Sequence, residues 1–142
     1  MNLYGISGEI FLAISSMIAL LISVFSSKDS SLKITTRFCN LSLLISLILI
    51  ISSHQNSGYL FNGMYVYDGL SLYSKILILL GTILTLLIGS KPQKIDGFNQ
   101  PEYPVLILFS VLGMVLMTSS KNLISLYMAL ELQSLPLYVI AA

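Results

Sequence analysis

Glu131 is the residue whose type and position most clearly suggest chemistry, because it lies in the middle of the last apolar run, residues 123–142. A charged carboxylate at the centre of a lipid bilayer costs on the order of 3 kcal/mol or more. It must therefore be protonated, paired with a cation or open to a water-filled cavity. A carboxyl group that alternates between such states can load and release a proton. The alternative is an ion pair that only holds helices together.

The neighbours of Glu131 along the chain support the proton-transfer hypothesis. Tyr127, Ser134 and Tyr138 lie four residues before, three after and seven after Glu131, so on a helix they share one face with it. Pro136 lacks an N–H and clashes with the preceding turn, so we expect it to kink or open the helix there. Backbone groups freed beside a buried carboxylate can hold water, which would support proton transfer.

Lys75 is the second candidate for proton transfer, and Asp68 lies a short distance before it. Lys75 falls in the first third of an apolar run. We expect its ammonium group to snorkel to the membrane interface, with a role in proton transfer as the alternative. Asp68 is expected to cap the helix or to act as a structural partner.

Five apolar runs must position these side chains, and each is close to the roughly 20 residues that a membrane helix needs. The chain has 142 residues, of which 56% are hydrophobic and 9% are charged, whereas soluble domains carry about 25% charged residues. Alternating strands are absent from the runs, and lipid accepts only helices or closed barrels. The sequence therefore predicts a single all-α membrane domain with helices at residues 10–26, 34–53, 70–89, 103–119 and 123–142.

The distribution of cations predicts the orientation of these helices. Lys28, Lys33 and Arg37 lie in or beside the first polar break, and Lys91 and Lys94 lie in the third, whereas the second break has no Lys or Arg. Lys121 is a single exception on the opposite side. By the positive-inside rule, the first and third breaks face the cytoplasm or matrix, and the N-terminus faces the intermembrane space or periplasm.

Small residues on the first predicted helix indicate a packing face. Ser15, Ala19 and Ser23 recur at four-residue spacing, which lets two helix backbones approach closely. The segment before this helix has no Lys or Arg, which argues against a secretory signal and an Arg-rich transit peptide, so we expect the helix to be retained.

Several function classes are disfavoured by composition. The net charge is +1, and no cluster of Lys and Arg offers a phosphate-binding surface, so nucleic-acid binding is not expected. With one Cys and one His, no metal or cofactor site is expected, and no nucleotide-binding or nucleophile motif is present. We therefore expect no redox chemistry in this chain.

Four segments resemble one known family. Residues 122–142 (NLISLYMALELQSLPLYVIAA) closely resemble the antiporter-like subunit 2 of respiratory complex I, the NADH dehydrogenase subunit 2 family. Residues 67–75 (YDGLSLYSK), 102–108 (EYPVLIL) and 112–120 (LGMVLMTSS) are also similar, in the same order. The resemblance is strong in the last 40 residues and loose in the first 60.

The resemblance implies a bundle of up to about fourteen helices with two inverted repeats, each with a broken helix. It places Glu131 at the family's fifth-helix glutamate, which pairs with lysines on later helices during proton pumping coupled to quinone reduction elsewhere in the NADH:ubiquinone reductase complex. The implied partners are lipid, other membrane-arm subunits and a second chain carrying the C-terminal part of subunit 2. The implied location is the mitochondrial inner membrane or, alternatively, the bacterial plasma membrane.

Two other functions remain open at this stage. One is a subunit of a multisubunit sodium/proton antiporter, which shares the fold by relationship. The other is a small membrane subunit that only packs against others, in which case Glu131→Gln would change neither proton pumping nor assembly.

Overall fold

Five long α-helices dominate the computed structural model, which describes residues 3–26, 28–53, 58–60, 62–89 and 102–141. Each is long and apolar enough to cross a membrane. The prediction of an all-α, multi-pass membrane protein with five spanning helices is therefore confirmed. In order along the chain the helices are α1 (Ser7–Phe25), α2 (Lys28–Ser52), α3 (Gly69–Gly89), α4 (Glu102–Ser119) and α5 (Leu123–Ala141).

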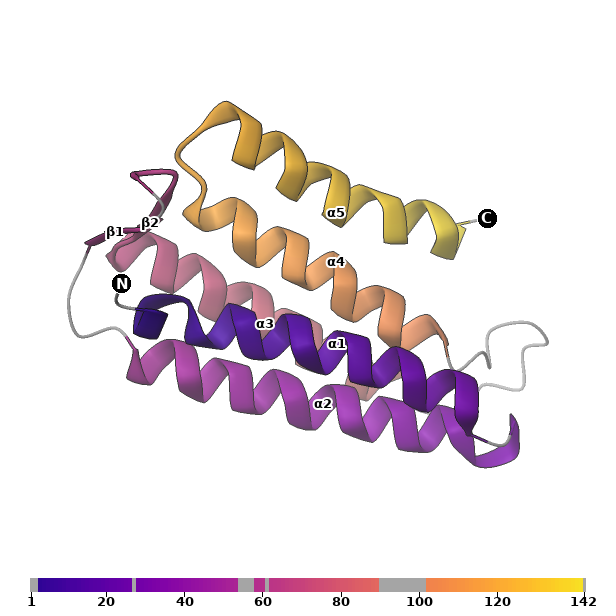
Figure 1. Ribbon diagram of the computed structural model, residues 1–142. Coiled ribbons are helices and arrows are strands. Elements are labelled where there is room, and N and C mark those ends of the chain that lie inside the picture. Colours follow the sequence, from indigo (N-terminus) through magenta and orange to yellow (C-terminus); the bar gives the residue numbers. More distant parts are fainter. Residues whose placement is uncertain (1–2, 27, 54–57, 61, 90–101, 142) are drawn as a thin grey trace.

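The helices lie side by side in one bundle, with α5 on its outer side (Figure 1). α4 contacts α1, α2 and α3, whereas the extensive contact of α5 is with α4. The core lies between α1, α2, α3 and α4, and its largest fully buried apolar side chains are Leu12, Leu43, Leu79, Leu108, Val105 and Val115. α5 therefore has only one of its faces covered by the described chain.

Two of the helices begin at side-chain caps. A carboxylate oxygen of Asp68, Oδ1, accepts a hydrogen bond of 2.8 Å from the backbone N–H of Ser71, so Asp68 caps α3 as predicted. The side-chain oxygen of Asn122 accepts one of 3.2 Å from the N–H of Ile124 at the start of α5. These caps satisfy backbone donors that the helix itself leaves unpaired.

The first two helices begin earlier than the apolar runs predict. α1 starts at Ser7, after a 3-10 turn η1 (Leu3–Ile6), and α2 starts at Lys28 rather than at residue 34. Backbone hydrogen bonds continue a helix past the end of its apolar stretch, so hydropathy alone places these ends too late. The shift matters because it puts Glu9, which lies before the predicted first run, inside α1.

A small β-hairpin between α2 and α3 was not predicted. β1 (Gly58–Leu60) pairs antiparallel with β2 (Tyr65–Tyr67) at one end of the bundle (Figure 1). Its turn contains Asn62 and Gly63, both with positive φ (56° and 86°), and Asn-Gly is a strong hairpin signal. β2 also bridges to Ser120 at the end of α4, which holds the hairpin over the helix ends.

Small residues allow the closest helix approaches. Ser15, Ala19 and Ser23 are all buried, as predicted for the packing face of α1. A second site of this kind was not predicted. A Cβ at Gly113 of α4 would lie 2.5 Å from the backbone nitrogen of Gln133 in α5, so α4 and α5 are in near-backbone contact there.

Candidate functional site

Glu131 lies on the face of α5 that points away from the rest of the bundle. It is exposed, as are Tyr127 and Tyr138, whose exposed fractions are 64% and 69%. Ser134 is partly buried, and its hydroxyl donates a hydrogen bond of 2.7 Å to the carbonyl of Leu130. The predicted shared face is therefore present. Within the part of the chain that the structure describes, Glu131 has no cationic partner, because the one salt bridge there lies elsewhere.

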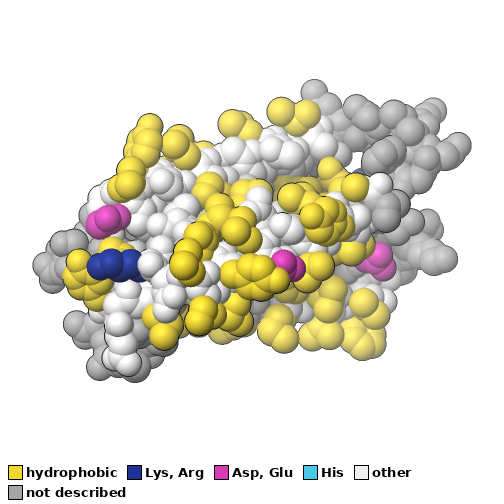
Figure 2. All heavy atoms as spheres, turned by 90° about the horizontal axis from the view of Figure 1, so that it is seen from above, with side chains coloured by type: hydrophobic (Ala, Val, Ile, Leu, Met, Phe, Trp, Pro, Cys, Tyr) yellow, Lys and Arg dark blue, Asp and Glu magenta, His cyan; other side chains and the backbone are white. Residues whose placement is uncertain are grey.

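The face around Glu131 is apolar and large. Figure 2 views the molecule from the α5 side and shows hydrophobic side chains spread across it. In lipid or against protein, a carboxylate in such surroundings needs a partner or water. The exposed apolar residues of α5 include Leu123, Ile124, Met128, Leu135, Leu137 and Val139.

Pro136 lies inside α5, and the helix continues through it to Ala141. Pro136 and Ala129 are the buried residues of α5. The predicted local opening of the helix therefore does not interrupt α5, and a bend at Pro136 stays a prediction.

Lys75 does not snorkel to the interface, so that expectation was wrong. It is 3% exposed and forms a salt bridge with Oε1 of Glu9, which is also 3% exposed. The two residues are 66 positions apart and come from α3 and α1. The side chain of Lys75 points inward because a buried carboxylate offers its ammonium a stronger partner than the membrane surface does.

Tyr65 of β2 completes this buried cluster. Its hydroxyl donates a 2.5 Å hydrogen bond to Oε1 of Glu9 and accepts one of 2.8 Å from Nζ of Lys75. Burial, and then the nearby Glu9 carboxylate, raise the pKa of the Tyr65 phenol far above its usual value, so the phenol keeps its proton. We call Glu9, Tyr65 and Lys75 the buried triad.

One oxygen of the triad is left without a partner. Oε1 of Glu9 receives hydrogen bonds from both other members, whereas Oε2 is buried and has no hydrogen-bond partner among the described residues. Ionised side chains inside a protein are stabilised fully only when their remaining lone pairs are also satisfied. The ion pair of the triad is therefore incompletely compensated.

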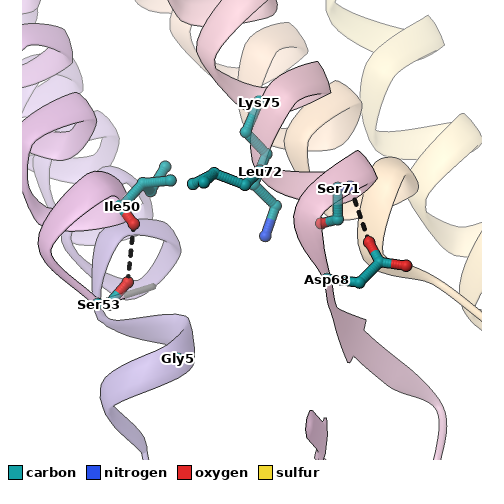
Figure 3. A pocket seen from close by; sticks show the side chains of 7 residues that line it. All are labelled: Gly5, Ile50, Ser53, Asp68, Ser71, Leu72 and Lys75. Atoms are coloured by element: carbon teal, nitrogen blue, oxygen red, sulfur yellow. Dashed lines mark hydrogen bonds between the residues drawn. The ribbon is translucent and has the colours of Figure 1, made fainter. Parts of the chain in front are cut away.

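A small pocket reaches the triad from the hairpin end of the bundle (Figure 3). Its volume is about 10 Å³, close to the space that one water molecule needs. The amino group of Lys75 points into it, and exposed Asp68 lies at its rim. The other residues that line it are Gly5, Ile50, Ser53, Ser71 and Leu72.

Glu9 and Tyr65 were not predicted as site residues from the sequence, and the structure does not bring Lys75 near Glu131. Lys75 contacts Glu9 from α1 and Tyr65 from β2, whereas Glu131 lies on the outer face of α5. Glu9 carried a signal that was not used, since an acid so close to an apolar run suggests a partner in another helix. Among the described residues, no group of three or more His, Cys, Asp or Glu side chains could hold a metal ion.

Comparison with known proteins gives matches over nearly the whole chain. NADH-quinone oxidoreductase subunit N of Bartonella bacilliformis is 42% identical over 137 residues, which cover 94% of this chain and 27% of that protein. The protein of the same name from Pelagibacter ubique is 45% identical over 142 residues, with 99% and 30% covered. No protein-family model matches.

The structural comparison agrees with these sequence matches. A chain in the structure "Respiratory complex I from Thermus thermophilus with bound Aureothin" matches with a TM-score of 0.75 and 27% identity, over 95% of this chain and 29% of that chain. The 142 residues thus span less than a third of the length of the relatives they match. Over that part, the chain is similar in sequence and fold to subunit N of bacterial NADH-quinone oxidoreductases.

Proposed function

We propose that this chain is part of the proton-translocating membrane-arm subunit N of NADH-quinone oxidoreductase. Subunit N corresponds to the subunit 2 of complex I that the sequence resembles. The role of the chain is to contribute Glu131 to proton transfer coupled to quinone reduction elsewhere in the complex. The observation that carries this proposal is 35–45% identity to subunit N proteins over 94% or more of the chain, as in the relatives from Acidiphilium cryptum and Pelagibacter ubique. The redox groups then belong to other subunits.

The environment of Glu131 supports a site shared with another part of the complex. Glu131 lies within a helix long enough to span the membrane, on a face with Tyr127 and Tyr138 that no described element covers. An acid on an open apolar face needs a cation or water from outside that face. We propose that lysines from the remainder of the family's fold, or from a second chain, supply it.

The location follows from the same proposal. An energy-coupling membrane houses the complex, either the mitochondrial inner membrane or the bacterial plasma membrane, and the reported relatives are bacterial. We place the N-terminus on the intermembrane-space or periplasmic side, because Lys33 and Arg37 lie at the opposite end of α1 and α2 from the hairpin. Lys91 and Lys94, which also support this orientation, lie outside the described residues.

The test is Glu131→Gln in the assembled complex, with NADH-driven proton pumping and quinone reduction measured in the same vesicles. We expect the ratio of protons pumped to NADH oxidised to fall, with assembly near normal, because an exposed position on α5 tolerates an isosteric amide. Glu102→Gln is the matched control, since Glu102 is an exposed glutamate in the first turn of α4. Unchanged pumping by correctly assembled Glu131→Gln complex would refute the proposal and favour a purely structural subunit.

A further inference from the structure

We propose that the buried triad of Glu9, Tyr65 and Lys75 is a second proton-binding site, separate from Glu131, which exchanges protons with the aqueous phase at the hairpin end of the bundle. Protonation of Glu9 can be measured whether or not the proposed function is correct. Only a role for this protonation in proton transport rests on the proposed function. The juxtaposition that carries the proposal is an incompletely satisfied ion pair beside a pocket that opens to that end.

The first step is that the buried ion pair of the triad carries an unfavourable desolvation free energy. Two ionised side chains inside a membrane protein need every lone pair and N–H group satisfied before their attraction offsets the loss of water. Oε2 of Glu9 has no partner among the described residues, and Oε1 already accepts from both Lys75 and Tyr65. A proton bound at Glu9 removes the uncompensated negative charge, and the ammonium of Lys75 then depends on the polar groups and water of the pocket in place of the carboxylate.

The second step is that protons can reach Lys75. Its amino group points into the pocket, where hydroxyl groups of Ser53 and Ser71 and exposed Asp68 offer hydrogen-bonding partners for water (Figure 3). A pocket of this size, with polar groups on more than one side, suits a single water molecule. Asp68 at the rim attracts hydrated protons towards it.

The charged surroundings of the triad are simple. α3 supplies Lys75, the residue that caps α3 is Asp68, β2 supplies Tyr65, and α1 supplies Glu9. Ile50 of α2 and Ser53, which directly follows α2, also line the pocket and do not ionise. From α4, the hydroxyl of Ser119 hydrogen-bonds that of Ser71 at 2.8 Å. In the described chain, Glu9 and Lys75 are thus the pair between which a proton moves, because Tyr65 keeps its own proton.

The transfer balances without a further reactant. Nζ of Lys75 gives a proton to the carboxylate of Glu9, which breaks one N–H bond, forms one O–H bond and leaves both groups neutral. A hydrated proton arriving through the pocket then protonates the Lys75 amine. The triad has then taken up one proton from the hairpin side, and the reverse sequence returns it.

The test is infrared spectroscopy of the assembled complex in membranes, titrated with pH, which detects the C=O stretch of a buried protonated carboxyl group. We expect a band that appears on acidification and is lost in Glu9→Gln. The Tyr65→Phe variant should shift it to higher frequency, because the carboxyl loses its phenol partner. Tyr59→Phe, on the exposed side of the same hairpin, is the matched control and should leave the band unchanged.

Two further arms keep the result decisive. If Glu9→Gln fails to assemble, Glu9→Asp keeps the charge and should replace the band with one at a different frequency. Glu131→Gln should leave the Glu9 band in place, so loss of pumping in that variant and loss of this band are separate outcomes. A spectrum in which neither Glu9 substitution nor Tyr65→Phe alters any pH-dependent carboxyl band would overturn the proposal and leave the triad as a static ion pair.

Discussion

A substitution that removes one charge of the buried triad measures how its ion pair contributes to stability. Glu9→Gln keeps the shape of the side chain but leaves the ammonium of Lys75 without its counter-charge at 3% exposure. Tyr65 cannot replace the lost charge, because it stays a neutral phenol that accepts only one of the Lys75 hydrogen bonds. The uncompensated ammonium is therefore the main consequence of the substitution.

The expected magnitude follows from the burial of both partners. Breaking a fully buried ion pair by removing one member costs about 3–5 kcal/mol, whereas replacing both members by neutral groups of similar size is often close to neutral. We therefore expect Glu9→Gln to be strongly destabilising and the double variant with Lys75→Met to recover most of the loss. The coupling energy between the two sites should then be at least about 2 kcal/mol.

The assay is the temperature at which half of the assembled complex dissociates, read on native gels for the wild type, both single variants and the double variant. Glu102→Gln serves as the control, because an exposed substitution of this kind changes stability by no more than about 0.5 kcal/mol. The reasoning is refuted if the double variant dissociates at or below the temperature of the less stable single variant, since the two charges would then not be coupled.

The remaining predictions concern packing and orientation. Gly113→Ala should destabilise the contact between α4 and α5 by about 1–3 kcal/mol, because the new Cβ would lie 2.5 Å from the backbone nitrogen of Gln133. Gly81→Ala is the control, because a Cβ at Gly81 meets nothing within 4 Å. Equal thermal stability of the two variants would contradict the expectation. A cysteine at exposed Asn62, in a Cys39→Ala background, should react with a membrane-impermeant maleimide from the intermembrane-space or periplasmic side; labelling from the opposite side only would reverse the proposed orientation.

Hydropathy predicted the five helices well because membrane thickness fixes the length of an apolar run. The observed helices overlap all five predicted ranges, and the last three begin within one residue of the prediction. The hairpin was not predicted, because a short polar break between apolar runs shows little periodicity. The pair Asn62-Gly63 nevertheless indicated a turn. The start of helix α1 was predicted too late in the sequence because its first turn is polar. As a result, Glu9 was not assigned to a helix.

The two candidate sites differ in how much of each could be read from the sequence. The face of Glu131 followed from helical spacing alone, because Tyr127, Ser134 and Tyr138 are close to it along the same helix. The partners of Lys75 could not be found from helical spacing, because Tyr65 and Glu9 are 10 and 66 residues away and belong to other elements. A single lysine near a helix end fits snorkelling equally well until its tertiary neighbours are known.

The sequence by itself therefore determined that this chain crosses a membrane as helices and that one acid, Glu131, lies in the middle of the last of them, since both depend on local composition and the helical repeat. Only the tertiary structure decided that Glu131 faces away from the bundle and that Lys75 faces into it. Which face a helix buries depends on the helices packed around it, and burial then decides whether a charge finds water, lipid or another charge.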